Sequence, residues 1–163
     1  MYVIDKRIEL VQPLMIPVGP LSYELVEDYT HYWIDTEGKI NRIIVPKKTI
    51  TDGASVPQFA WSISGIRPDG LIRAAALVHD WIYVNKGNLP DGSHTVWNGI
   101  GDDFFNQKDL PGIVNSHNWV DDGRAFSHRQ ADKLFAHMMT EAEMKPARVT
   151  VAYVSVRLFG WWV

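Results

Sequence analysis

Runs of aromatic and β-branched residues mark the first third of the chain as strand-like. They lie at residues 32–34 and 40–45, on either side of a glycine-containing turn at residues 36–38. Two such runs flanking a short turn predict an antiparallel β-hairpin. A further strand is expected from Val3 to Val11. Residues 1–50 are therefore the β-rich part of the predicted fold.

Two later segments carry apolar residues at the spacing of one helix face. The first predicts a helix within residues 71–87, ended by the glycine at position 87, and its apolar positions are Leu71, Ala74, Ala75, Val78 and Ile82. The second begins at Ser127, where Ser127 and Gln130 fit a capping box. A last helix is expected from Ala147 to Phe159, with a buried face of Val149, Tyr153, Val156 and Phe159. Together these form the helical part, residues 127–163.

Two stretches between these elements lack regular apolar spacing. Residues 51–70 open with TDGASVP, which is typical of a loop with turns. Residues 88–126 are rich in Gly, Asn, Asp and Pro, and we expect an irregular insertion with at most short helical turns near Asp103–Phe105. The overall prediction for residues 1–163 is a single α+β domain: N-terminal antiparallel strands with a hairpin, then a bundle of about three helices, interrupted by a long loop insertion.

Composition and charge narrow the class of protein. The chain is 46% hydrophobic and 21% charged, which is typical of a globular domain. The formal net charge is -3 and no run of Lys or Arg exceeds two residues, so no nucleic-acid partner is expected. The absence of cysteine excludes disulfides and thiolate metal sites. We also expect no secretory signal and no transmembrane segment, because the N-terminus has no apolar core and Arg157 interrupts the last apolar stretch.

The strongest candidate chemistry lies in the sequence His79-Asp80-Trp81-Ile82-Tyr83. On a helix, His79 and Tyr83 share a face because they are four residues apart, whereas Asp80 points elsewhere. An imidazole that moves protons needs a carboxylate to orient it. Asp132, near the start of a later helix, is the natural candidate for that carboxylate. The alternative is a buried polar pair that only fixes helix packing.

Several residues are candidates for binding a divalent cation. Asp80, which is not needed to orient His79, is one candidate, and the loop of Asp52-Gly53-Ala54-Ser55 would offer oxygen ligands to Ca²⁺, or amides to an anion. Asp52 would equally suit a plain turn. His128 and Asp132 have the i, i+4 spacing of two ligands of Zn²⁺ or Mn²⁺, with His79 and Asp80 completing the set. The alternative for His128 is a solvated residue in the first helical turn.

The chain resembles a family of small proteins of tailed bacteriophages and prophages that is catalogued as a domain of unknown function. The resemblance runs through four segments, Ile43 to Pro57, Ala74 to Tyr83, His128 to Met139, and Ala152 to Gly160. It implies a phage origin, a location in the virion or the cytoplasm of the infected host, and other phage structural proteins as partners. No settled activity comes with it.

A weaker resemblance concerns mechanism. HDxxY on one helix and an Ala-Asp pair on a later helix are similar to the core of phospholipase A2. That resemblance implies that His79 is the base, Asp80 the Ca²⁺ ligand, Asp132 the orienting carboxylate and Tyr83 its support. The chain departs from phospholipase A2 in having no cysteines, and no glycine-rich calcium loop unless residues 52–55 replace it.

Two functions therefore follow from the sequence. The first is a hydrolase-like site, metal-assisted by Ca²⁺ or Zn²⁺, that cleaves a lipid ester or a cell-wall bond during infection. It predicts that His79, Asp80 and Asp132 converge on an accessible cleft. The second is a non-catalytic virion or tail component in which the same cluster is a sealed network between helices.

Overall fold

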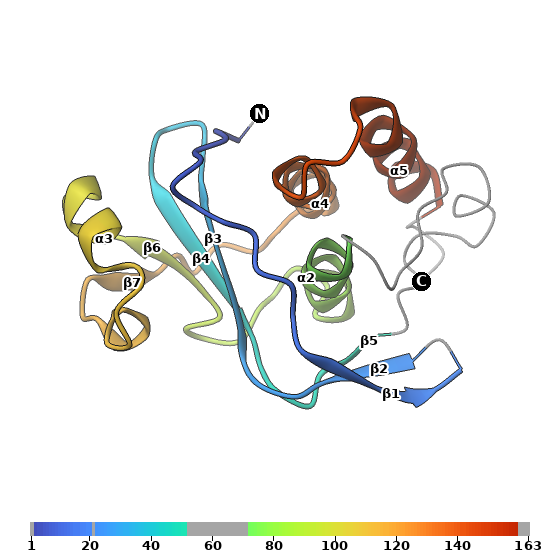
Figure 1. Ribbon diagram of the computed structural model, residues 1–163, viewed down its shortest axis with the longest axis horizontal. Helices are drawn as coiled ribbons and strands as arrows, with labels where there is room; N and C mark the ends of the chain where they lie inside the picture. Colours follow the sequence, from blue (N-terminus) through green and yellow to red (C-terminus); the bar gives the residue numbers. More distant parts are fainter. Residues whose placement is uncertain (1, 21, 52–71, 160–163) are drawn as a thin grey trace.

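The computed structural model describes residues 2–20, 22–51 and 72–159 of the chain (Figure 1). It has the predicted α+β class, with antiparallel strands in two sheets and helices that follow the five N-terminal strands in the chain. Among the described residues, no helix has both the length and the apolar character that crossing a membrane would require.

The larger sheet has four strands in the order β3-β4-β6-β7, all antiparallel to their neighbours. Its strands are β3 (Tyr29–Ile34), β4 (Ile40–Val45), β6 (His94–Trp97) and β7 (Trp119–Asp121). The hairpin of β3 and β4 is the one predicted from the sequence, and Ile34 faces Ile40 next to its turn.

The smaller sheet has the order β1-β2-β5, formed by β1 (Met15–Gly19), β2 (Ser22–Leu25) and β5 (Ile50–Thr51). The strand predicted from Val3 to Val11 was wrong. In that segment only Val3 forms a bridge, with Ile34, and the carbonyl of Val11 instead accepts a hydrogen bond from the Tyr29 hydroxyl. This carbonyl therefore bonds a side chain of β3 and not the backbone of a neighbouring strand.

The prediction of an irregular stretch at residues 88–126 was wrong where this stretch forms strands, but the helical turn expected near Asp103–Phe105 is confirmed. This stretch contains β6, β7, the helix α3 (Gly101–Gln107) and a 3₁₀ turn, η1 (Ile113–Asn115). Strand β6 lies inside the larger sheet and pairs with β4. Four- and three-residue strands are too short to show a periodic pattern, and the partner of β6 lies about fifty residues earlier in the chain.

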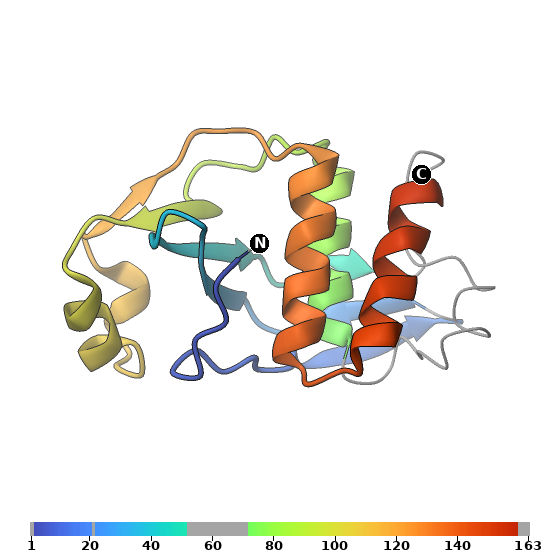
Figure 2. The ribbon, with the colours of Figure 1, turned by 90° about the horizontal axis from the view of Figure 1, so that it is seen from above.

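Three longer helices lie on the side of the β3–β4 hairpin away from α3 (Figure 1): α2 (Arg73–Val84), α4 (His128–Glu141) and α5 (Pro146–Phe159). Helix α4 packs against both α2 and α5 (Figure 2). The predicted capping box at its start is confirmed, since Ser127 and Gln130 bond each other's backbone N–H groups. On α5, Ala152 and Val156 are buried, whereas the predicted Val149 and Tyr153 are only partly buried and nothing is described of the Phe159 side chain.

Two hydrophobic clusters lie on opposite faces of the larger sheet. The β3–β4 pair stands between α3 and the helices α2 and α4 (Figure 1). Trp33 and Ile43 face the larger cluster, which includes Leu77 and Phe135 of the helices. Ile34 belongs to the smaller cluster with residues such as Phe104. The alternation of side chains along β3 therefore supplies both cores.

Candidate functional site

His79 of α2 and Asp132 of α4 meet where these two helices pack together. His79 Nε2 lies 2.9 Å from Asp132 Oδ1, and neither side chain is exposed. The pairing of these two residues across helices, expected from their positions in the sequence, is therefore present.

Two further side chains bind the same carboxylate. The Tyr83 hydroxyl donates to Asp132 Oδ1 at 2.7 Å, and its ring stacks on His79 with 4.2 Å between ring centroids. From α5, Arg157 Nη1 donates to Asp132 Oδ2 at 3.0 Å. The sequence analysis treated Arg157 only as an interruption of an apolar stretch. Arg157 is the single charged residue between Val149 and Phe159 and stands beside buried Val156, which was a sign that it has a partner but not of which one.

The charge states of the cluster follow from burial and hydrogen bonding. Burial raises the pKa of Asp132, but hydrogen bonds from His79, Tyr83 and Arg157 outweigh it and hold that pKa below its usual value. Burial lowers the pKa of His79, and Asp132 offsets this only in part. Burial, followed by the bond to Asp132, raises the pKa of the Tyr83 hydroxyl. At neutral pH the site therefore holds an ionised Asp132, a neutral His79 and a protonated Tyr83.

The hydrogen bonds also define the tautomer of His79. An ionised carboxylate only accepts hydrogen bonds, so His79 Nε2 carries the proton and donates it to Asp132. Nδ1 then carries the lone pair. This atom is buried and has no hydrogen-bond partner among the described residues, and it lies 4.0 Å from Asp80 Oδ1. The unshared nitrogen of His79 thus faces a second carboxylate.

Asp80 joins this buried cluster to the surface. It is 8% exposed, and its Oδ2 accepts a hydrogen bond from the Thr51 hydroxyl at the end of β5. Asp80 also lines a surface pocket of about 320 Å³ together with Lys47 and Lys48. His79 itself is 1% exposed, so the accessible cleft expected of a hydrolase reaches Asp80 and not His79 directly.

The remaining predicted ligands do not join a metal site in the described structure. Asp52 lies outside the described residues. His128 is exposed and stacks on Tyr83, with 4.9 Å between ring centroids. Within residues 2–20, 22–51 and 72–159, no group of three or more His, Asp or Glu side chains is arranged to hold a metal ion. The role of Asp80 in binding a cation stays a prediction.

A second buried cluster was not expected from the sequence. Glu141 of α4 lies 3.1 Å from His137 Nε2 and 3.3 Å from His31 Nε2 of β3. Burial raises the pKa of Glu141, but its contacts with the two histidines outweigh this and lower the pKa to about 2. This carboxylate therefore ties α4 to the larger sheet.

Comparison with family models gives a match over residues 23–156, to the family described as "Protein of unknown function (DUF1353)". The chain belongs to this family. The matched range includes every residue of the His79 cluster except Arg157, which lies one residue beyond it. No curated protein and no solved structure matches the chain.

Proposed function

We propose that this DUF1353 protein carries a hydrolase-like site in which His79 is the general base. The observation that carries the proposal is the state of the His79 ring. Its Nε2 is held by an ionised, buried Asp132, and its unshared Nδ1 faces Asp80 at 4.0 Å. A neutral imidazole oriented by a carboxylate is the usual arrangement for abstracting a proton near neutral pH.

The distance between His79 Nδ1 and Asp80 Oδ1 suits a reacting water. These two atoms lie 4.0 Å apart, and one water molecule can donate a hydrogen bond to each of them. In the proposed reaction that water gives a proton to His79 Nδ1 and its oxygen attacks the carbonyl carbon of an ester or amide. Asp132 then stabilises the imidazolium, which returns the proton to the leaving group. The bond to the leaving group breaks, and an acid and an alcohol or amine are formed.

A divalent cation, Ca²⁺ or Zn²⁺, is part of the proposal at Asp80. Its carboxylate and the nearby Thr51 hydroxyl are oxygen ligands of the kind that Ca²⁺ prefers. When bound there, the cation would polarise the carbonyl of the substrate.

The proposed substrates are lipid esters or cell-wall bonds attacked during infection. The resemblance to phage proteins and to the HDxxY core of phospholipase A2 supports this choice. It also supports a bacteriophage origin, a place in the virion or the cytoplasm of the infected host, and other phage structural proteins as partners.

Burial of the cluster favours a second candidate function. His79 is 1% exposed and Asp132 0% exposed, which suits a network that only holds α2, α4 and α5 together. In that case the protein would be a non-catalytic virion or tail component. The two functions predict different effects of losing His79. Removal of a residue from a buried network lowers the free energy of unfolding, whereas removal of a general base lowers the rate of hydrolysis.

The test measures hydrolysis of fluorogenic phospholipid vesicles and of dye-labelled peptidoglycan by the wild type, His79→Gln and the surface control His117→Gln. We expect the wild type and the control to be equally active and His79→Gln to lose about 10²–10⁴-fold in rate, since general base catalysis is worth that much. Activity removed by a chelator and restored by Ca²⁺ or Zn²⁺ in the wild type, but not in Asp80→Asn, would place the cation at Asp80.

Two results together would contradict the catalytic proposal. Neither substrate would be hydrolysed by the wild type with either cation, and His79→Gln would unfold at a lower urea concentration than His117→Gln. That pattern would reject the catalytic proposal and leave the structural network as the role of the cluster.

A further inference from the structure

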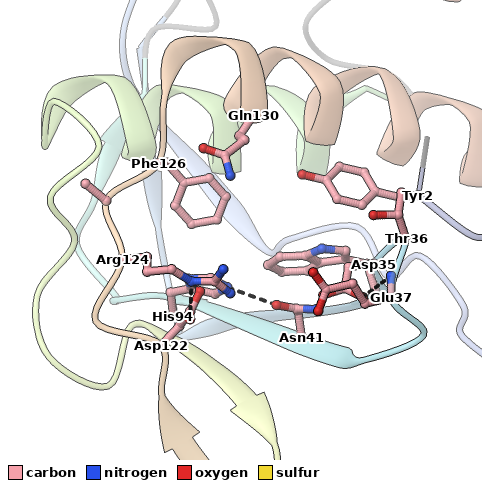
Figure 3. Close-up of a pocket in the computed structure, with 12 residues that line it drawn as sticks. Tyr2, Asp35, Thr36, Glu37, Asn41, His94, Asp122, Arg124, Phe126 and Gln130 are labelled. Carbon is pink, nitrogen blue, oxygen red and sulfur yellow. Dashed lines mark hydrogen bonds and ion pairs between the residues drawn. The ribbon is translucent and has the colours of Figure 1, made fainter.

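Another polar site surrounds His94, and it is distinct from both the His79 cluster and the Glu141 cluster. It is a pocket of about 160 Å³ beside the larger sheet, closed partly by the aromatic residues Tyr2, Trp33 and Phe126. Figure 3 shows His94, Asp122 and Arg124 at one end of the pocket and Asp35, Glu37 and Tyr2 at the other. None of these residues was singled out by the sequence analysis.

A chain of hydrogen bonds defines the tautomer of His94. Asn41 Nδ2 donates to Asp35 Oδ2 at 3.1 Å and to the Lys39 carbonyl at 3.0 Å. The other amide atom of Asn41, Oδ1, therefore accepts, and it accepts from His94 Nε2 at 3.2 Å. With its proton on Nε2, a neutral His94 carries the lone pair on Nδ1.

That lone pair faces a second acceptor. His94 Nδ1 lies 3.4 Å from Asp122 Oδ2, and it is buried without a hydrogen-bond partner among the described residues. The other oxygen, Asp122 Oδ1, accepts from Arg124 Nε at 2.6 Å. His94 as a whole is 9% exposed. The buried His94 Nδ1 thus lies beside the partly exposed Asp122 carboxylate, no described group donates to Nδ1, and both residues line the pocket.

The charge and the walls of the pocket define the donor that fits. The lining has three carboxylates, Asp35, Glu37 and Asp122, against one guanidinium, Arg124. The centroid of the Phe126 ring lies 4.7 Å from that of His94, and Trp33 stacks on His94 with 5.6 Å between ring centroids. Aromatic faces and an excess of carboxylates both attract a cation.

We propose that this pocket binds a primary ammonium group, which donates one hydrogen bond to His94 Nδ1 and another to Asp122 Oδ2. The ligand class is an alkylamine head, as found on a lysine side chain or an amino sugar. A metal ion fits less well, because within the described residues no third His, Asp or Glu joins His94 and Asp122 in a metal-binding group. Burial, which outweighs the pull of Asp122, lowers the pKa of His94 and so keeps Nδ1 available as an acceptor. The proposal does not depend on the hydrolase-like site.

The experiment uses n-butylammonium chloride as the probe and follows the ¹⁵N chemical shift of His94 Nδ1, assigned with His94→Gln. We expect a saturable shift at neutral pH in the wild type. Sodium chloride at the same ionic strength should not produce it, and neither should tetramethylammonium, which has no N–H donor. Titrations with N-acetyl-lysine amide and with glucosamine then distinguish a peptide source of the amine from a sugar source.

Matched variants distinguish binding in this pocket from a general effect of the net charge of the protein. Asp122→Asn should weaken binding by about tenfold or more, because a charge-assisted hydrogen bond is lost. The exposed control Asp109→Asn, with the same change in net charge, should bind like the wild type. Arg124→Gln removes a competing cation and should bind more tightly, and because Arg124 is largely exposed this variant keeps the test open should Asp122→Asn fail to fold. No saturable shift in the wild type, equal shifts with tetramethylammonium, or equal binding by Asp122→Asn and Asp109→Asn would each overturn the proposal.

Discussion

His79 and His94 occupy similar local arrangements but differ in what holds them. In each ring Nε2 has a polar partner, and Nδ1 is unshared and faces a carboxylate, at 4.0 Å for His79 and 3.4 Å for His94. The partner of His79 is the ionised Asp132, whereas the partner of His94 is the neutral amide of Asn41. Only the first partner stabilises an imidazolium. The same pattern therefore suits proton transfer at His79 and hydrogen bonding to a ligand at His94.

The surroundings of the two partners sharpen this difference. Asp132 also binds Tyr83 and Arg157, so three donors hold one buried charge between three helices. Asn41 joins only the turn of the β3–β4 hairpin to β6. Removal of the first partner should therefore affect both rate and stability, and removal of the second should affect much less of the molecule.

The largest expected effect is on rate. Asp132→Asn keeps the shape of the side chain but removes its charge, so the imidazolium formed at His79 loses its stabilisation. We expect hydrolysis to fall by about 10³-fold, a size within the usual range for general base catalysis. The equivalent change at the second site, Asn41→Asp, should leave the rate within about twofold of the wild type. Steady-state assays on the same vesicle or peptidoglycan substrate check both, and an equal loss in the two variants would remove the functional distinction between the histidines.

The next effect is on stability. Asp132→Ala leaves His79, Tyr83 and Arg157 without their acceptor, and breaking a buried ion pair in this way costs about 3–5 kcal/mol in free energy of unfolding. Asn41→Ala leaves a neutral network unsatisfied and should cost about 1–3 kcal/mol. Urea unfolding of both variants gives the comparison. A smaller loss for Asp132→Ala than for Asn41→Ala would show that the cluster does not hold the helices together.

The smallest expected effect is the dependence of stability on pH. Both histidines have a pKa lowered by burial from the usual 6.5, so the unfolded chain takes up protons more readily than the folded one. Their contribution to stability is present above about pH 6.5 and is lost as the pH falls toward the lowered values. We expect His79→Gln to reduce this acid loss more than His94→Gln does, because His79 is the more buried of the two. Unfolding measured at about pH 7 and about pH 5 tests this, and a larger reduction in His94→Gln would reverse the ranking.

Local patterns were enough to predict the longer elements. The β3–β4 hairpin and the helices α2, α4 and α5 follow from side-chain periodicity, a turn and a capping box, all of which act within a few residues. The short strands β6 and β7 escaped prediction because their pairing depends on partners far away in the chain. The segment from Val3 to Val11 was predicted to be a strand and is not one. Only Val3 bridges β3, and the carbonyl of Val11 accepts a hydrogen bond from a side chain of β3.

The candidate site divides in the same way. The sequence alone determined that His79 and Tyr83 share a helix face, because a helix repeats every 3.6 residues, and it pointed to Asp132 as their partner. Tertiary structure alone decided that Arg157 completes the cluster, that Asp80 connects it to the surface, and that Asn41, His94 and Asp122 form a second site. The physical reason is that these contacts join residues from different helices and strands. Their distances are set by packing and strand register, which no spacing along the chain encodes.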